Sequence, residues 1–130
     1  MKLEEQVCSF DLAKRLKELG VKQESLFYWS QYMTRRMKAP KWRLMYGEHG
    51  TNWYSAFTVA ELGEILPAFS KAYDCEGNAV MGNRKLGASE WAIGYTNIGN
   101  GHTHQEFAIT EADARAKMLI YLLEKTLITP

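Results

Sequence analysis

The sequence has 130 residues, 46% hydrophobic and 24% charged, with a net charge of +1, and these values predict one globular domain over residues 1–130. A chain of this length buries enough surface to fold without metals or disulfides. It lacks an apolar stretch near the roughly 18 residues that cross a bilayer, and residues 1–5 lack the pattern of a signal peptide, so we expect a cytoplasmic protein with no membrane partner.

The first predicted element is a helix over residues 9–19, where leucines recur at helical spacing and charged residues fill the opposite side. Gly20 is suited to end this helix, because glycine readily adopts a left-handed conformation. A strand is expected near residues 25–32, which are rich in aromatic side chains. Residues 33–39 are predicted to form a basic loop that Pro40 closes.

The middle of the chain is predicted to form a hairpin and a short helix. Apolar residues alternate over residues 41–47, the period of a half-buried strand, and residues 53–57 are expected to return as its partner. The T-x-x-E pattern of a capping box opens a predicted helix over residues 58–66. Residues 68–89 contain several Gly and Asn without periodicity, so we expect a long connecting loop there.

A second hairpin is expected over residues 91–109. A three-residue turn at 99–101 would pair Ile93 with Phe107. This register places four apolar residues on the core face: Trp91, Ile93, Phe107 and Ile109. The last predicted helix, residues 110–125, would pack on that face through its own apolar side chains, Ala112, Ala116, Leu119 and Leu123.

Together these elements predict an α+β fold. The two antiparallel hairpins would form one sheet of four or five strands, packed on the three helices. Both halves contain an alternating Trp-x-Leu/Ile-x-Tyr strand followed by a capped helix. This similarity suggests a ββα pseudo-repeat.

Three blocks of the sequence resemble a widespread family of small, uncharacterised phage and prophage proteins. They are residues 12–29 (LAKRLKELGVKQESLFYW), 54–67 (YSAFTVAELGEILP) and 110–124 (TEADARAKMLIYLLE). The family has no catalytic motif, so the resemblance assigns no residue roles. It implies an accessory protein in the host cytoplasm that binds a host component, and inhibitors of host defence of the anti-CRISPR kind are one example.

Residues 28–43 combine basic and aromatic side chains and contain no acidic residue. Cations attract phosphates and aromatic faces stack on bases, a combination used to bind single-stranded nucleic acid or nucleotides. The predicted binding residues are Trp29, Tyr32, Arg35, Arg36, Lys38, Trp42 and Arg43. A solvated loop beside core aromatics is the alternative interpretation of the same pattern.

Two other patterns could carry chemistry. His102 and His104 alternate along a strand, so they share a face with Glu106 and could hold a transition metal. The register above puts that face opposite the core, and solvent-facing polar residues explain it equally well. Cys8 and Cys75 lie far apart in the sequence, in no C-x-x-C pair and with no His at the spacing of a metal site. This arrangement indicates two reduced thiols. We therefore predict no catalytic residue, no metal and no cofactor.

The leading hypothesis is a non-enzymatic phage-type protein that binds a host protein or a small nucleotide signal through residues 28–43. The alternative is a DNA-binding regulator with a helix-turn-helix in residues 16–29. A third is a metal-dependent enzyme at His102 and His104. Residues 1–46 hold ten basic and five acidic residues and the remainder six and ten, and such opposite charges would suit a homodimer.

Overall fold

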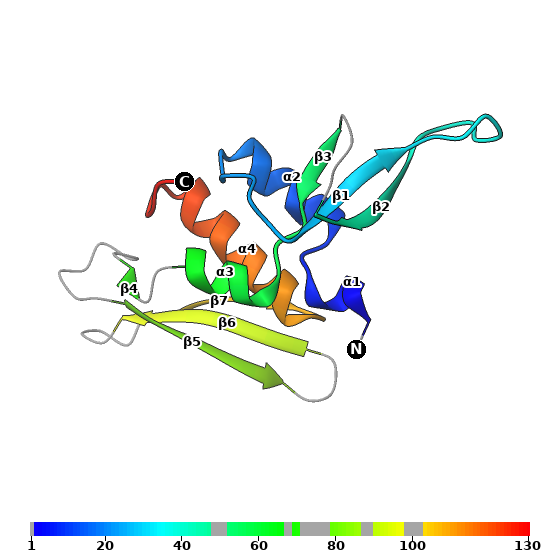
Figure 1. Ribbon diagram of the computed structural model, residues 1–130. Coiled ribbons are helices and arrows are strands. Elements are labelled where there is room, and N and C mark those ends of the chain that lie inside the picture. Colours follow the sequence, from blue (N-terminus) through cyan, green and yellow to red (C-terminus); the bar gives the residue numbers. More distant parts are fainter. Residues whose placement is uncertain (1, 48–51, 67–68, 71–78, 87–89, 98–102) are drawn as a thin grey trace.

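The computed structural model describes residues 2–47, 52–66, 69–70, 79–86, 90–97 and 103–130 (Figure 1). Its helices are α1 (Leu3–Gln6), α2 (Phe10–Glu18), α3 (Val59–Ile65) and α4 (Glu111–Glu124). Its strands are β1 (Phe27–Tyr32), β2 (Lys41–Tyr46), β3 (Trp53–Ser55), β4 (Phe69–Ser70), β5 (Ala79–Leu86), β6 (Glu90–Asn97) and β7 (Thr103–Ala108). Helices and antiparallel strands confirm the predicted α+β class. No helix of the described residues has the length and apolar character to span a bilayer.

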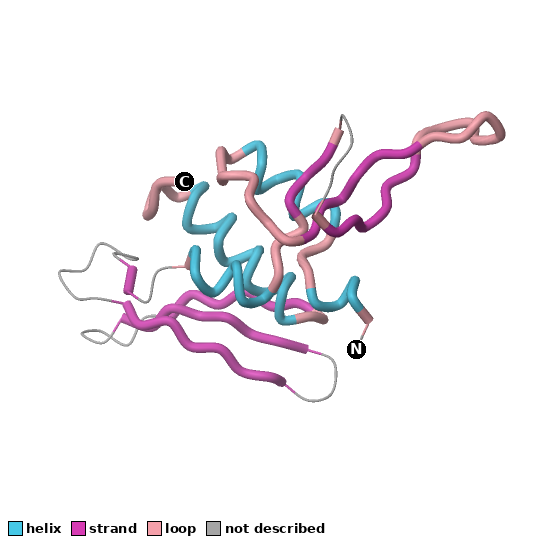
Figure 2. The backbone as a smooth tube through the Cα atoms, in the orientation of Figure 1, coloured by secondary structure: helices cyan, strands magenta, loops and turns pink. Residues whose placement is uncertain are grey.

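Helix α4 lies at the centre of the molecule. It packs on β6 and β7 and also contacts α2 and α3, so that the helices gather between the two groups of strands (Figure 2). Its buried residues are Ala112, Ala114, Ala116, Met118, Leu119, Leu122 and Leu123. The predicted apolar stripe of this helix is confirmed. Burial extends to further sides of the helix because several elements surround it.

The strands form two sheets, where the sequence predicted one. The first has the order β2-β1-β3 and the second the order β4-β5-β6-β7. The predicted pairing of residues 41–47 with 53–57 is wrong, since β2 and β3 flank β1 on opposite sides. Exposed Lys41 and Arg43 suit β2 to an edge, where side chains meet water. Because residues 41–47 and 53–57 do not form a hairpin, the first ββα unit of the proposed repeat is not present.

The predicted loop over residues 68–89 is also wrong, because it contains β4 and β5. Strand β5 pairs with β6 along its whole length, from Ala79 opposite Asn97 to Leu86 opposite Glu90. Its Gly and Asn residues have low strand propensity, which concealed it in the sequence. Pairing with β6 supplies the stability that local propensity lacks.

The register of β6 and β7 differs by one residue from the prediction. Ile93 lies opposite Glu106 and Ala92 opposite Phe107. A one-residue slip exchanges the faces of a strand, so Phe107 is 41% exposed and Ile109, just beyond β7, is 77% exposed. The turn that sets this register, at residues 99–101, lies outside the described residues.

The predicted helix ends are confirmed. Ser9 is the N-cap residue of α2, and Gly20, which follows the C-cap, has φ of +89°. At α3, the Thr58 hydroxyl accepts from the Glu61 amide while the Glu61 carboxylate accepts from the Thr58 amide, at 3.2 and 2.8 Å. The capping box is therefore present at α3 as the sequence indicated, whereas the Ser9 side chain makes no capping hydrogen bond at α2.

Candidate functional site

Strands β1 and β2 form a hairpin that extends away from the rest of the molecule (Figure 1). We call residues 28–43 the cationic arm. Its basic side chains are all exposed: Arg35, Arg36, Lys38, Lys41 and Arg43. None of them forms an ion pair with a carboxylate of the described residues. The arm therefore presents positive charge to solvent, and no carboxylate of the described residues neutralises it.

The aromatic residues of the arm divide between two faces of the β2-β1-β3 sheet, because successive strand residues point to opposite sides. The inner face packs on the segment around α2. There the Trp29 indole N–H donates to the carbonyl of Cys8 at 2.9 Å, and the Trp42 ring lies 4.6 Å from that of Phe10. Trp29 and Trp42, both predicted to bind a ligand, thus serve to hold the arm to the body of the protein.

The outer face carries the other aromatic residues. The Arg43 guanidinium lies 5.0 Å from the centre of the Tyr32 ring, within the range of a cation–π contact. Tyr28 and Trp53 meet edge to face at 5.2 Å. This face therefore places aromatic rings beside the cations of the arm.

Ser30 lies in the middle of the outer face. It pairs with Arg43 on β2 and with Trp53 on β3, and it stands between Tyr28 and Tyr32 along β1. The Ser30 residue is only 4% exposed, and its hydroxyl has no hydrogen-bond partner among the described residues. A buried hydroxyl in this condition is uncommon and unfavourable.

The structure brings together part of the predicted site. Tyr32 and Arg43 are in contact, and Arg35, Arg36 and Lys38 stand at the tip of the same hairpin. Sequence reasoning missed Ser30 and Trp53. Trp53 comes from β3, whose pairing with β1 has no local signal, so only the topology of the sheet joins it to the arm.

His104 does not face solvent, as the predicted register had placed it. His104 lies on the face of β7 that meets α4, where its ring stacks on Tyr121 at 3.6 Å. Its Nε2 lies 2.9 Å from Glu106 Oε1. His102 lies outside the described residues, and no group of three metal-ligating side chains occurs within them. His104 is thus a packed residue of the interface between sheet and helix.

Cys8 is a buried free thiol. Burial away from water raises its pKa to about 12, and the nearby Asp113 carboxylate acts in the same direction. A thiol that stays protonated at neutral pH is a poor nucleophile. Cys75 lies outside the described residues.

The helix-turn-helix interpretation of residues 16–29 is wrong. After α2, residues 21–26 have no helical structure, and the chain continues directly into β1. The Phe27-Tyr28-Trp29 run is a strand because its aromatic side chains pack on both faces of the sheet. No second helix is present there to enter a DNA groove.

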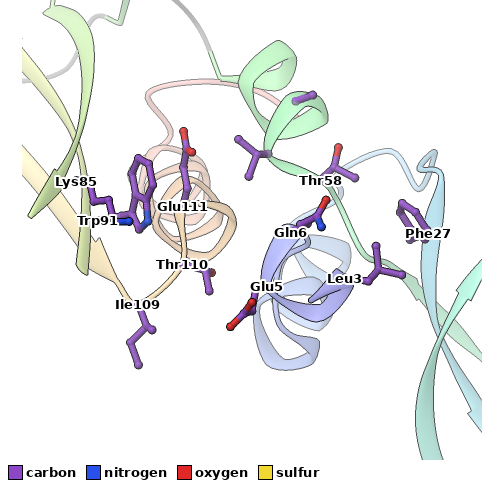
Figure 3. Close-up of a pocket in the computed structure, with 12 residues that line it drawn as sticks. Leu3, Glu5, Gln6, Phe27, Thr58, Lys85, Trp91, Ile109, Thr110 and Glu111 are labelled. Atoms are coloured by element: carbon purple, nitrogen blue, oxygen red, sulfur yellow. The ribbon is translucent and has the colours of Figure 1, made fainter. Parts of the chain in front are cut away.

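A cleft of about 750 Å³ opens between α1, the first residues of α3 and α4, the end of β5 and the start of β6, and Phe27 at the base of the hairpin also lines it (Figure 3). Trp91 forms part of its wall, with Lys85 Nζ 5.8 Å from the indole centre. The volume suits a small ligand.

The polar side chains that line this cleft already serve local structure. Thr110 caps α4, as Thr58 caps α3. The Glu111 carboxylate receives hydrogen bonds from Arg115 at 2.8 and 3.1 Å, and Glu5 accepts from the amide of Lys2. These groups therefore offer no arrangement of nucleophile and base.

The arm and this cleft are two surfaces of the described residues that could serve recognition, and a smaller apolar pocket of about 500 Å³ lies beside Leu119 and Ile128. The arm is distinguished by its charge, and the cleft by its shape. Comparison with protein-family models, with curated proteins and with solved structures gave no match.

Proposed function

We propose that this is a non-enzymatic binding protein whose cationic arm engages nucleic acid. The observation that carries the proposal is the projecting hairpin with five exposed basic residues and no ion pair to a described carboxylate. Phosphate backbones are recognised by such unneutralised Lys and Arg side chains. A β-ribbon that extends from a domain is also a shape that reaches along a nucleic-acid strand.

The shape of the arm favours a long polyanion over a small nucleotide signal. Small ligands bind in concave sites that bury most of their surface, whereas the arm extends outward from the domain. A chain of phosphates can instead follow its length and contact several cations together. Each neutralised phosphate adds to affinity by releasing bound counterions.

Absence of catalysis is part of the proposal. The thiol of Cys8 is buried and protonated, and the polar groups of the cleft are bound to neighbouring backbone or side chains. The resemblance to phage proteins adds a context in which small accessory proteins act on host components. In that context the partner would be host or phage nucleic acid, and an acidic host protein is the competing class.

The proposal is tested by removing charge from the arm. We expect the variant Arg35→Ala/Arg36→Ala/Lys38→Ala to lose about 10-fold or more in affinity for a fluorescein-labelled oligonucleotide at about 50 mM salt, measured by fluorescence anisotropy. The slope of log affinity against log salt should also become shallower, by about 0.7 for each lost contact to a single strand.

A matched control removes the same charge elsewhere. Lys14, Lys22 and Lys125 are exposed and lie outside the arm. Their combined replacement by Ala should change affinity far less. Equal losses in the two triple variants would attribute binding to net charge alone, and no binding of DNA or RNA by the wild type at low salt would refute the proposal and favour a protein partner.

A further inference from the structure

We infer that the arm selects single-stranded nucleic acid, with a base stacked at Tyr32 and Arg43 on the outer face. The inference rests on the proposed function, because it assumes that the arm binds nucleic acid. It adds a substrate class that charge alone does not specify. Three features of the outer face support it.

The first feature is the contact of Arg43 with Tyr32. The guanidinium lies 5.0 Å from the ring centre, and Arg43 is an exposed residue. A guanidinium is planar and weakly hydrated, so it stacks on aromatic systems on either face. An unpaired base can therefore stack on the exposed Arg43 guanidinium, as bases do on aromatic and Arg side chains of single-strand binding proteins.

The second feature is the Ser30 hydroxyl. It lies between Arg43 and Trp53 across the sheet and next to Tyr32 along β1, and it has no hydrogen-bond partner among the described residues. Base edges carry both donors and acceptors. Because Ser30 is only 4% exposed, a base edge satisfies this hydroxyl only when the side chains that cover it move aside on binding.

The third feature is that the Tyr32 ring lies beside the basic residues of the arm. Tyr32 lies at the end of β1 where the basic loop begins, and Lys41 faces it across the hairpin on the same side of the sheet. A strand whose base stacks at Tyr32 therefore carries its adjoining phosphates toward Lys41 and the tip. Bases in a duplex are stacked on each other and do not offer their faces, so a duplex would use only the cations.

The test compares three labelled probes of about 12 nucleotides: a thymidine strand, an abasic strand with the same phosphates, and the thymidine strand in a duplex with its complement. At low salt we expect the thymidine strand to bind about 10-fold tighter than either other probe. Equal affinities for all three would overturn the inference and leave the proposed function standing. Failure of all three to bind would overturn both.

Variants locate the stacking position. Tyr32→Leu should weaken binding of the thymidine strand about 10-fold and leave the abasic strand unchanged, and Tyr32→Phe should retain wild-type affinity. Tyr46→Leu is the matched control, because Tyr46 is a tyrosine of the same hairpin, 71% exposed, on the inner face. A loss for Tyr46→Leu equal to that for Tyr32→Leu, or an equal loss on the abasic probe, would contradict stacking on the outer face. Should Tyr32→Leu fail to fold, the three-probe comparison on the wild type still decides.

Discussion

Single side chains hold the start of α2 against α4. The carboxylate of Asp113, in the first turn of α4, accepts from the amide of Ser9 at 2.7 Å and so joins two helices distant in sequence. Cys8 lies beside that contact, fully buried, and its thiol is 4.0 Å from the carbonyl of Ser55. Such positions depend on contacts that no local pattern encodes.

Burial of Cys8 predicts a loss of stability at alkaline pH. Its pKa is raised from 9.0 to about 12 in the folded protein, so the folded state holds the thiol proton more tightly than the unfolded state. The free energy of unfolding should be unaffected by this group below about pH 9 and should fall as the pH rises from 9 toward 12. Burial also raises the pKa of Tyr95, which adds to the loss above about pH 10.

Urea titrations between pH 7 and pH 11 measure this effect. Cys8→Ala should lower stability at pH 7, because it leaves a small cavity, but should show a shallower decline above pH 9 than the wild type. Parallel declines in the two proteins would show that the Cys8 thiol does not carry the pH dependence.

At the level of elements, Glu61 connects α3 to the beginning of β1. Its carboxylate accepts from the amide of Leu26 at 2.9 Å and from the hydroxyl of Ser25 at 2.9 Å, in addition to its capping bond with Thr58. One side chain therefore both starts a helix and fixes the strand from which the arm extends. Hydrogen bonds to a charged acceptor are stronger than neutral ones, so the junction should be sensitive to its loss.

We expect Glu61→Ala to lower the free energy of unfolding by about 2–4 kcal/mol, because three donors lose their acceptor. Thr58→Ala, which removes only the cap, should cost about 1 kcal/mol. Glu64→Ala is the control on the same helix, since Glu64 is exposed, and it should change stability by less than about 0.5 kcal/mol. Denaturant titration measures all three. A cost for Glu61→Ala no larger than that for Thr58→Ala would mean that the bonds to Ser25 and Leu26 contribute little.

The three longer helices were predictable from sequence, whereas α1 and most of the strand pairing were not. Caps at Thr58 and Thr110 act within a few residues, so their patterns identify α3 and α4 directly. Pairing of β1 with both β2 and β3, and the existence of β5, depend on residues far apart in the chain. The observed register of β7 differs by one residue from the predicted one. Phe107 therefore lies on the face of the sheet opposite the predicted core face.

In the candidate site, too, the residues close together in sequence were predictable and those joined by strand pairing were not. Its cations are predictable because they lie within nine residues of each other and have no acidic residue between them. Trp29 and Trp42 were included because composition does not say which face of a strand a side chain occupies. Trp53 and Ser30 were missed because they join the site only through the order of strands in the sheet.

For the molecule as a whole, α4 and its surrounding helices form a body from which the arm projects (Figure 2). The inner face of the small sheet packs on this body through Phe10, Trp29 and Trp42, so the arm is anchored by aromatic contacts. An anchored β-ribbon with an exposed cationic tip can contact a strand of nucleic acid while the body stays unchanged. The cleft beside Trp91 reaches the base of the hairpin, where Phe27 forms part of its wall (Figure 3).

The most direct test of nucleic-acid binding by the cationic arm is a titration of ¹⁵N-labelled protein with a short thymidine strand at low salt, followed by two-dimensional NMR. The account predicts that amide shifts concentrate in residues 28–43 and at Trp53, and that signals of the cleft, including Trp91 and Glu111, stay unchanged. Shifts centred on the cleft, or an unchanged spectrum at saturating DNA, would contradict the claim that the cationic arm binds nucleic acid.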